Sequence, residues 1–134
     1  MKLSLPFHLR TGVWGETQAE HFLKAKGYRI LGRRVRVTAR DELDLVARDG
    51  DVLVFVEVKT RKTESFGAPL TAVDRAKRHT VSRAAVRYLQ RVKFPNVYFR
   101  FDVVEVVGQE GDPAPVIRHI ENAFTLDPQY RLPI

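Results

Sequence analysis

The sequence predicts an α/β fold, with a central mixed sheet of four to five strands flanked by helices in the order αβββαβ. Three observations predict this architecture. A helical pattern stands near the start of the chain, two alternating apolar segments joined by a turn signal follow, and a second helical pattern precedes another strand-like segment. All 134 residues are expected to form one domain, with an irregular tail over residues 126–134.

The first helix is expected in GVWGETQAEHFLKAKG, residues 12–27. Gly27 ends it, because glycine readily adopts the left-handed conformation that closes many helices. Ala19 and Leu23 should lie on its buried stripe. The next segment, YRILGRRVRV from Tyr28, is typical of a strand with basic residues mixed in.

The segments ELDLVA and VLVFVEVKT are expected to form a hairpin joined at RDGD. Asp-Gly is a strong turn signal, because both central residues of the favoured two-residue turn have positive φ. With Asp49 and Gly50 as the central residues, the numbers of paired residues sum to 99.

A second helix is expected over residues 71 to 93, after a loop that contains Gly67 and Pro69. NVYFRFDVVEVVG then predicts another strand, and VIRHIENAF predicts either a short edge strand or a helical turn. The apolar face of the helix comprises Val81, Ala84, Ala85, Tyr88, Leu89 and Val92.

Composition limits the class of protein. Hydrophobic residues make up 44% and charged residues 29%, as in ordinary globular chains. No apolar run approaches the roughly 20 residues that span a bilayer, and the opening MKLSLPFHLR lacks the apolar stretch of a secretory signal. The absence of cysteine excludes disulfides, zinc–thiolate sites and cysteine nucleophiles. A cytoplasmic protein is expected.

The charge balance favours a polyanionic partner. Lys and Arg number 23 against 16 Asp and Glu, which gives a net charge of +7, and the isoelectric point is near 10.1. Nucleic acid is the commonest partner of such chains, and an anionic membrane surface is the rival.

Four charged residues interrupt the apolar pattern of the hairpin: Glu42, Asp44, Glu57 and Lys59. In the expected register Asp44 faces Phe55 and Glu42 faces Glu57, and the four charged side chains share one face. A three-residue turn would break this shared face. The other face is expected to be wholly apolar and to pack on a helix; it comprises Leu43, Leu45, Ala47, Val52, Val54, Val56 and Val58.

Opposed carboxylates destabilise a sheet unless something neutralises them. Mg²⁺ or Mn²⁺ would do so, since hard cations take one or two carboxylates together with waters and substrate phosphate. Lys59 could then hold a phosphate oxygen, or orient or deprotonate a water. The alternative is a solvated strand end in which Lys59 bridges two carboxylates.

Glu16 lies near the buried stripe of the first helix, three residues before Ala19. Its carboxylate either stabilises the helix N-terminus through the dipole or reaches toward the acidic end of the sheet. Both interpretations remain open on the sequence.

The pattern of Asp44, then Glu57-Val58-Lys59, with a glutamate on a preceding helix, resembles the PD-(D/E)xK nuclease signature. The wider string GVWGETQAEHFL, GYRIL, DELDLVARDGDVLVFVEVKTR and RFDVVEV is similar to the YraN family, small bacterial proteins regarded by inference as endonucleases. That family is distantly similar to archaeal Holliday-junction resolvases. The resemblance covers roughly Gly12 to Val107 and implies a restriction-endonuclease-like fold with a metal site at one sheet edge.

The resemblance also implies roles for individual residues. Asp44, Glu57, Lys59 and Glu16 would be catalytic, and the ligands of Mg²⁺ or Mn²⁺ would be Asp44, Glu57, Glu16 and Glu42. Asp41 replaces the glycine of the family's usual G-E-I-D segment, and an asparagine usual in the preceding strand is absent.

The implied function is metal-dependent endonucleolytic hydrolysis of DNA, on branched or single-stranded structures, with a homodimer expected by analogy with junction resolvases. One alternative is a nucleic-acid-binding module that does not cut, and another is a basic scaffold for protein or lipid partners; no membrane partner is expected. The basic side chains expected to contact nucleic acid are Arg33, Arg34, Arg36, Arg40, Arg61, Lys62 and Lys77.

A basic stripe on the second predicted helix has two interpretations. It either contacts phosphates or forms a solvated face, and it comprises Arg75, His79, Arg83, Arg87 and Arg91. Asp102 is expected to pair with a nearby cation, Arg100 or Lys77.

Overall fold

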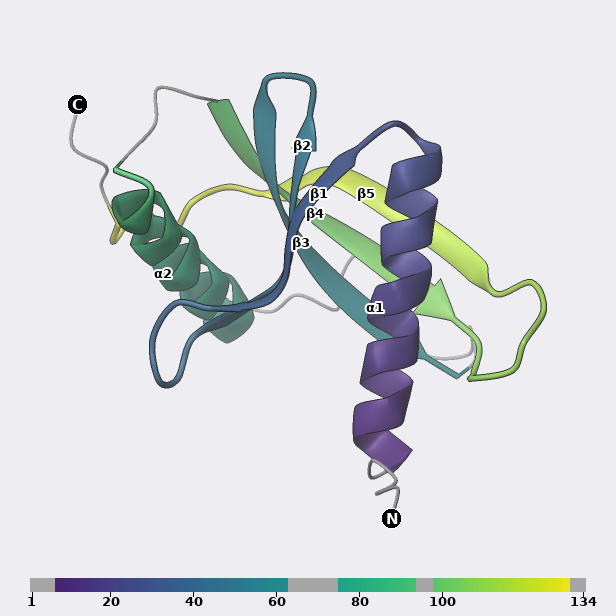
Figure 1. Cartoon of the computed structure of the whole chain (residues 1–134). Coiled ribbons are helices and arrows are strands. Elements are labelled where there is room, and N and C mark those ends of the chain that lie inside the picture. Colours follow the sequence, from purple (N-terminus) through teal and green to yellow (C-terminus); the bar gives the residue numbers. More distant parts are fainter. Residues whose placement is uncertain (1–6, 63–74, 94–97, 131–134) are drawn as a thin grey trace, which may run out of the picture.

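Five strands form one mixed sheet with a helix on each face in the computed structural model, which describes residues 7–62, 75–93 and 98–130 (Figure 1). Within these ranges no helix is long and apolar enough to cross a membrane. The elements are α1 (Phe7–Ala25), β1 (Arg29–Arg36), β2 (Glu42–Asp49), β3 (Val52–Arg61), α2 (Arg75–Arg91), β4 (Tyr98–Val107) and β5 (Val116–Phe124).

The strand order across the sheet is β1-β2-β3-β4-β5. β3 and β4 run parallel and are connected through α2, whereas every other neighbouring pair is antiparallel. The predicted α/β class with a central mixed sheet is therefore confirmed, and the arrangement is consistent with a restriction-endonuclease-like fold. The VIRHIENAF segment, left open by the sequence, is the edge strand β5.

α1 ends as the sequence predicts. Gly27 has a φ of 95°, its N–H donates to the carbonyl of Lys24, and the N–H of Tyr28 donates to the carbonyl of Leu23. These two bonds form a Schellman motif, which satisfies carbonyls that the helix end would otherwise leave unpaired. α1 begins earlier than expected, at Phe7 instead of residue 12.

Each face of the sheet has its own hydrophobic core. Ala19 and Leu23 of α1 are fully buried against one face, where they pack on side chains such as Val54 and Val104. On the opposite face, α2 buries its predicted apolar stripe against β3 and β4, with Phe55 and Phe101 at the centre. The two helices therefore hold the sheet between them, and functional side chains can project only where this cover ends.

The predicted register of the β2–β3 hairpin is wrong by two residues. Asp49 pairs with Val52, so that the central turn residues are Gly50 and Asp51, and only Gly50 has a positive φ, of 60°. Glycine at the first central position with a positive φ is typical of a type II′ turn, whereas the prediction assumed positive φ at both positions. The numbers of paired residues sum to 101 instead of 99.

The shift by two keeps the parity of the faces but changes the partners. Continued one residue beyond Leu45↔Val56, the register places Asp44 across from Glu57 instead of Phe55. The expectation that Glu42 directly opposes Glu57 is therefore wrong.

The prediction of one wholly apolar face also fails at Leu43. Leu43 packs in the same cluster as Val46 and Phe55, beneath α2, whereas Leu45 packs in the cluster beneath α1. The simple alternation of β2 breaks between these positions, which is where its ladder with β3 ends. Glu42 and Asp44 therefore lie on a stretch of β2 that has separated from β3.

Candidate functional site

Asp44 lies where β2 leaves β3. Its Oδ2 atom accepts a hydrogen bond from the backbone N–H of Val58 at 2.9 Å. The carboxylate therefore replaces a ladder partner and lies against the peptide that links Glu57 to Val58. Because a buried N–H without a partner is costly, this bond fixes the Asp44 side chain at the E-x-K segment of β3.

Glu57 is buried at the edge of the α2 side of the sheet. Its Oε1 atom is 3.0 Å from Nζ of Lys77, in the first turn of α2. Burial, and then the negative charge of Asp44, raise the pKa of Glu57 to about 7, although Lys77 and Lys59 act in the opposite direction. Two carboxylates that raise a pKa in this way repel each other, which is the electrostatic condition that favours binding of a cation.

Lys59 is two residues beyond Glu57 on β3 and is half-buried. Its positive charge lowers the pKa of Glu57, so the ammonium lies close enough to act on this carboxylate. Among the residues that the structure describes, Lys59 makes no hydrogen bond or ion pair. The ammonium beside the acidic pair is therefore available for an added ligand.

Glu16 brings a third carboxylate from α1. Its Oε2 atom is bound by Arg34, with Nη2 at 2.8 Å and Nε at 2.9 Å. Burial raises the pKa of Glu16, Arg34 lowers it, and the carboxylates of Asp44 and Glu42 raise it further. The expectation that Glu16 reaches toward the acidic end of the sheet is confirmed by this geometry.

Gly15 allows α1 to approach the end of β3. A Cβ atom at Gly15 would overlap Oγ1 of Thr60 and lie 3.1 Å from the Thr60 Cβ. Thr60 directly follows Lys59, so this close approach places Glu16 at the same end of the sheet as the E-x-K segment. A glycine inside a helix normally weakens it, and here the close contact gives the reason for its presence.

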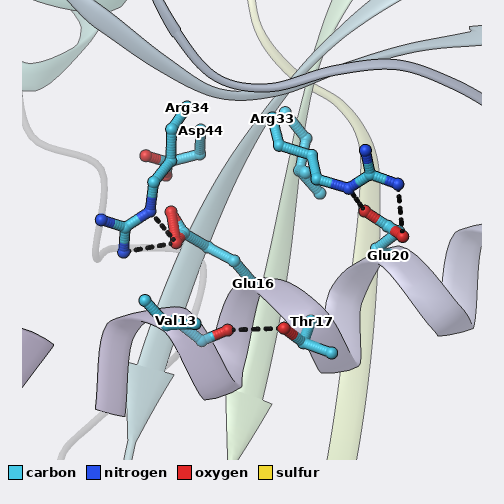
Figure 2. A pocket seen from close by; sticks show the side chains of 8 residues that line it. Val13, Glu16, Thr17, Glu20, Arg33, Arg34 and Asp44 are labelled. Atoms are coloured by element: carbon cyan, nitrogen blue, oxygen red, sulfur yellow. Dashed lines mark hydrogen bonds and ion pairs between the residues drawn. The ribbon is translucent and has the colours of Figure 1, made fainter. Parts of the chain in front are cut away.

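A pocket of about 260 Å³ lies between α1 and the first two strands. Figure 2 shows Glu16 pointing from α1 toward Arg34 and Asp44, while Glu20 binds Arg33 on the other side of the pocket. Its rim therefore carries both carboxylates and guanidinium groups, and its apolar lining comes from Val13 and Leu45.

The donor set suits Mg²⁺ or Mn²⁺ only in part. Within residues 7–62, 75–93 and 98–130, no three His, Cys, Asp or Glu side chains lie close enough together to hold a metal ion. Asp44 and Glu57 do form an interacting pair of carboxylates, and Mg²⁺ commonly takes one or two carboxylates with waters and substrate phosphate completing the shell. Glu42 is bound to Arg36 at 3.1 Å instead. A metal shell shared by all four acids remains a prediction.

Comparison with known proteins identifies the chain. The model of the uncharacterised protein family UPF0102 matches residues 15–106. The chain belongs to this family.

Other UPF0102 proteins are similar over nearly their whole length. One from Geobacter sulfurreducens is 46% identical over 115 residues, covering 86% of this chain and 88% of the relative. One from Symbiobacterium thermophilum is 47% identical over 119 residues, covering 86% and 96%. One from Clostridium acetobutylicum is 38% identical over 117 residues, covering 87% and 95%. The resemblance inferred from the sequence motifs, to the YraN family, is thereby confirmed as membership of UPF0102.

Most basic residues predicted to contact nucleic acid are ion-paired in this UPF0102 protein. Arg40 and Lys62 are exposed, whereas the other five each bind an acid. The pairs are Arg33 with Glu20, Arg34 with Glu16, Arg36 with Glu42, Arg61 with Glu105, and Lys77 with Glu57.

Two buried acids were missed by the sequence reasoning. Asp41 is 1% exposed and binds Arg83 of α2 through two hydrogen bonds, of 2.7 and 2.8 Å. Glu105 is equally buried, between Arg61 at 3.1 Å and Arg118 at 2.9 Å. The replacement of the family's glycine by Asp41 was a signal for the first pair, because an acid there requires a partner.

The basic stripe of α2 is largely structural. His79 contacts Asp127 and Tyr130, and Arg91 donates to the backbone carbonyls of Arg36 and Val37. Together with Arg83, these residues attach α2 to the β1–β2 connection and to the chain after β5. Asp102 pairs with Arg100, as one of the two expectations had it, and also with the buried His119.

Proposed function

We propose that this UPF0102 protein is a metal-dependent endonuclease that hydrolyses phosphodiester bonds of DNA, on branched or single-stranded structures. The single observation that carries the proposal is the placement of the Asp44 carboxylate against the Glu57–Val58 peptide, one residue before Lys59. Three parts of a PD-(D/E)xK centre, from two strands, thereby lie within one stretch of backbone. Asp44 and Glu57 would hold Mg²⁺ or Mn²⁺.

Bound there, the metal ion would polarise a phosphoryl oxygen and lower the pKa of a water. Lys59 would orient the attacking water and offset the charge that develops on the phosphate oxygens. Glu16 would hold a water from the α1 side, since its carboxylate lines the pocket beside Asp44. Arg40 and Lys62, both exposed, would contact the backbone of the nucleic acid.

The test is a panel of linear, single-stranded, flapped and four-way DNA substrates, each incubated with Mg²⁺ or Mn²⁺. The wild-type protein is expected to cleave at least one of them in a metal-dependent reaction. Asp44→Ala and Glu57→Ala are expected to abolish cleavage while circular dichroism shows the fold intact. Full activity in either folded variant would exclude that residue from the mechanism.

A second candidate function is nucleic-acid binding without cleavage. It is favoured by one observation, that no three potential ligands form a metal centre within the described residues. Under this alternative, Asp44→Ala and Glu57→Ala would leave DNA affinity unchanged, and no substrate would be cut by any form of the protein.

A further inference from the structure

The carboxylates of the candidate centre are neutralised by the protein's own cations. Lys77 binds Glu57 at 3.0 Å, and Arg34 binds Glu16 at 2.8 Å. Lys77 comes from α2 and Arg34 from β1, so that the acids receive these cations from opposite sides of the sheet. A buried carboxylate requires such a partner, because an uncompensated charge away from water is costly.

Both pairs are asymmetric in exposure. The side chain of Lys77 is 38% exposed against 6% for Glu57, and that of Arg34 is 42% exposed against 16% for Glu16. Each cation can therefore swing into water without unpacking the core, while the acid cannot follow it. The ion pair of Arg83 with Asp41 differs, since both of its members are largely enclosed.

A divalent cation and these basic groups compete for the same oxygens. A metal ion at Glu57 would place two positive charges beside the Lys77 ammonium, and like charges at such a distance repel strongly in a partly buried site. The released side chains would then stand at the rim of the centre with no acid to neutralise them. Phosphate oxygens of a nucleic acid are the groups that such cations bind.

We propose that Lys77 and Arg34 are exchangeable counter-ions, which hold Glu57 and Glu16 in the metal-free protein and pass to the nucleic-acid backbone when a divalent cation binds. This inference rests on the proposed function. It makes metal binding and polyanion binding mutually reinforcing, because by linkage each ligand increases affinity for the other by the same factor. The protein would therefore hold its substrate tightly only when the centre is loaded.

Isothermal titration with Mg²⁺ at pH 8 tests the exchange directly. Lys77→Met removes the competing charge and is expected to tighten Mg²⁺ binding about fivefold or more. Lys77→Arg keeps the charge and should bind Mg²⁺ as the wild-type protein does. Lys24→Met is the matched control, because Lys24 also forms a Lys–Glu pair at 3.0 Å, with Glu20, and its loss should leave Mg²⁺ affinity unchanged.

A second variant protects the test against loss of folding. Arg34→Met removes the other counter-ion and is also expected to tighten Mg²⁺ binding, even if Lys77→Met proves too unstable to measure. Equal or weaker Mg²⁺ affinity in the folded variants would overturn the counter-ion proposal alone. Absence of Mg²⁺ binding in every form, wild type included, would overturn the proposed function as well.

The linkage is measured with a labelled single-stranded oligonucleotide and Ca²⁺, a divalent cation used here to load the centre without relying on cleavage. Fluorescence anisotropy should show that Ca²⁺ tightens binding in the wild-type protein, and that this gain is smaller in Lys77→Met. The same gain in both proteins would show that Lys77 is not passed to the nucleic acid.

Discussion

The carboxylate of Asp44 accepts the backbone N–H of Val58 across the gap where β2 leaves β3, with 2.9 Å between Oδ2 and N. One side chain therefore has two tasks. It satisfies a donor that the sheet ladder no longer pairs, and it presents a carboxylate beside Glu57. The position of the candidate centre follows from this bond, because it fixes how far the two strands separate.

Substitution of Asp44 separates these two tasks. Asp44→Asn retains a side-chain oxygen that can accept the Val58 N–H but loses the negative charge, so the fold should keep most of its stability while metal binding is lost. Asp44→Ala leaves the donor unpaired and is expected to lower the free energy of unfolding by about 1–3 kcal/mol. Urea denaturation of the two variants measures the difference. Equal stability losses would show that the bond is unimportant to the fold.

The raised pKa of Glu57 predicts a dependence of stability on pH. Since the folded pKa of about 7 lies above the ordinary value of 4.5, the folded protein retains a proton that the unfolded chain has lost. The stabilisation is complete below about pH 4.5 and is lost as pH rises through 7.

Glu57→Gln removes this titration. In the absence of divalent cations it should raise the free energy of unfolding at pH 8 by on the order of 2 kcal/mol, with little effect near pH 4. Thermal denaturation at both pH values checks the result, with Glu110→Gln, at an exposed position, as the control. A pH-independent effect of Glu57→Gln would contradict the assignment.

Gly15 is predicted to tolerate no side chain. Gly15→Ala forces a Cβ against Thr60, and the resulting shift of α1 should cost about 1–3 kcal/mol and displace Glu16. Gly12→Ala is the matched control in the same helix, since its Cβ would meet only Nη2 of Arg34, at an ordinary 3.6 Å. It should be neutral or stabilising, because alanine favours helices. Thermal melting of both variants tests the contrast, and similar melting temperatures would exclude close packing at Gly15.

The Asp41–Arg83 pair predicts a coupled loss of stability. Asp41→Asn breaks a largely enclosed ion pair and is expected to cost about 3 kcal/mol, while Arg83→Met in addition should cost less than the sum of the single changes. Arg83 lowers the pKa of Asp41, so this contribution should be present above the ordinary pKa of the carboxyl and disappear as pH falls below it. A double-mutant cycle by chemical denaturation at pH 7 and pH 3 measures both effects.

The sequence was sufficient for the elements but not for the hairpin register. Apolar periodicity, the closing Gly27 and the Asp-Gly turn locate the helices and strands because they are local signals. The choice between Asp49-Gly50 and Gly50-Asp51 as the central turn residues depends on side-chain packing against both helices. The two-residue error kept the acids at one end of the sheet but paired them wrongly.

The candidate site was predicted by residue type but not by arrangement. Asp44, Glu57 and Lys59 could be chosen from their spacing, whereas the ion pairs that occupy them could not. Lys77 reaches Glu57 only because α2 crosses the sheet between β3 and β4. Asp41 finds Arg83 across 42 residues of chain, and no local pattern reports a contact of that kind.

The most direct test of the central claim is the single-turnover rate of Mg²⁺-dependent DNA cleavage by Lys59→Ala. Lys62→Ala is the control, because Lys62 lies just beyond β3 and is exposed. With Asp44, Glu57 and Lys59 as the catalytic centre, Lys59→Ala should slow cleavage by about 100-fold or more while Lys62→Ala changes mainly the affinity for DNA. Equal cleavage rates for the two folded variants would contradict the assignment of this centre.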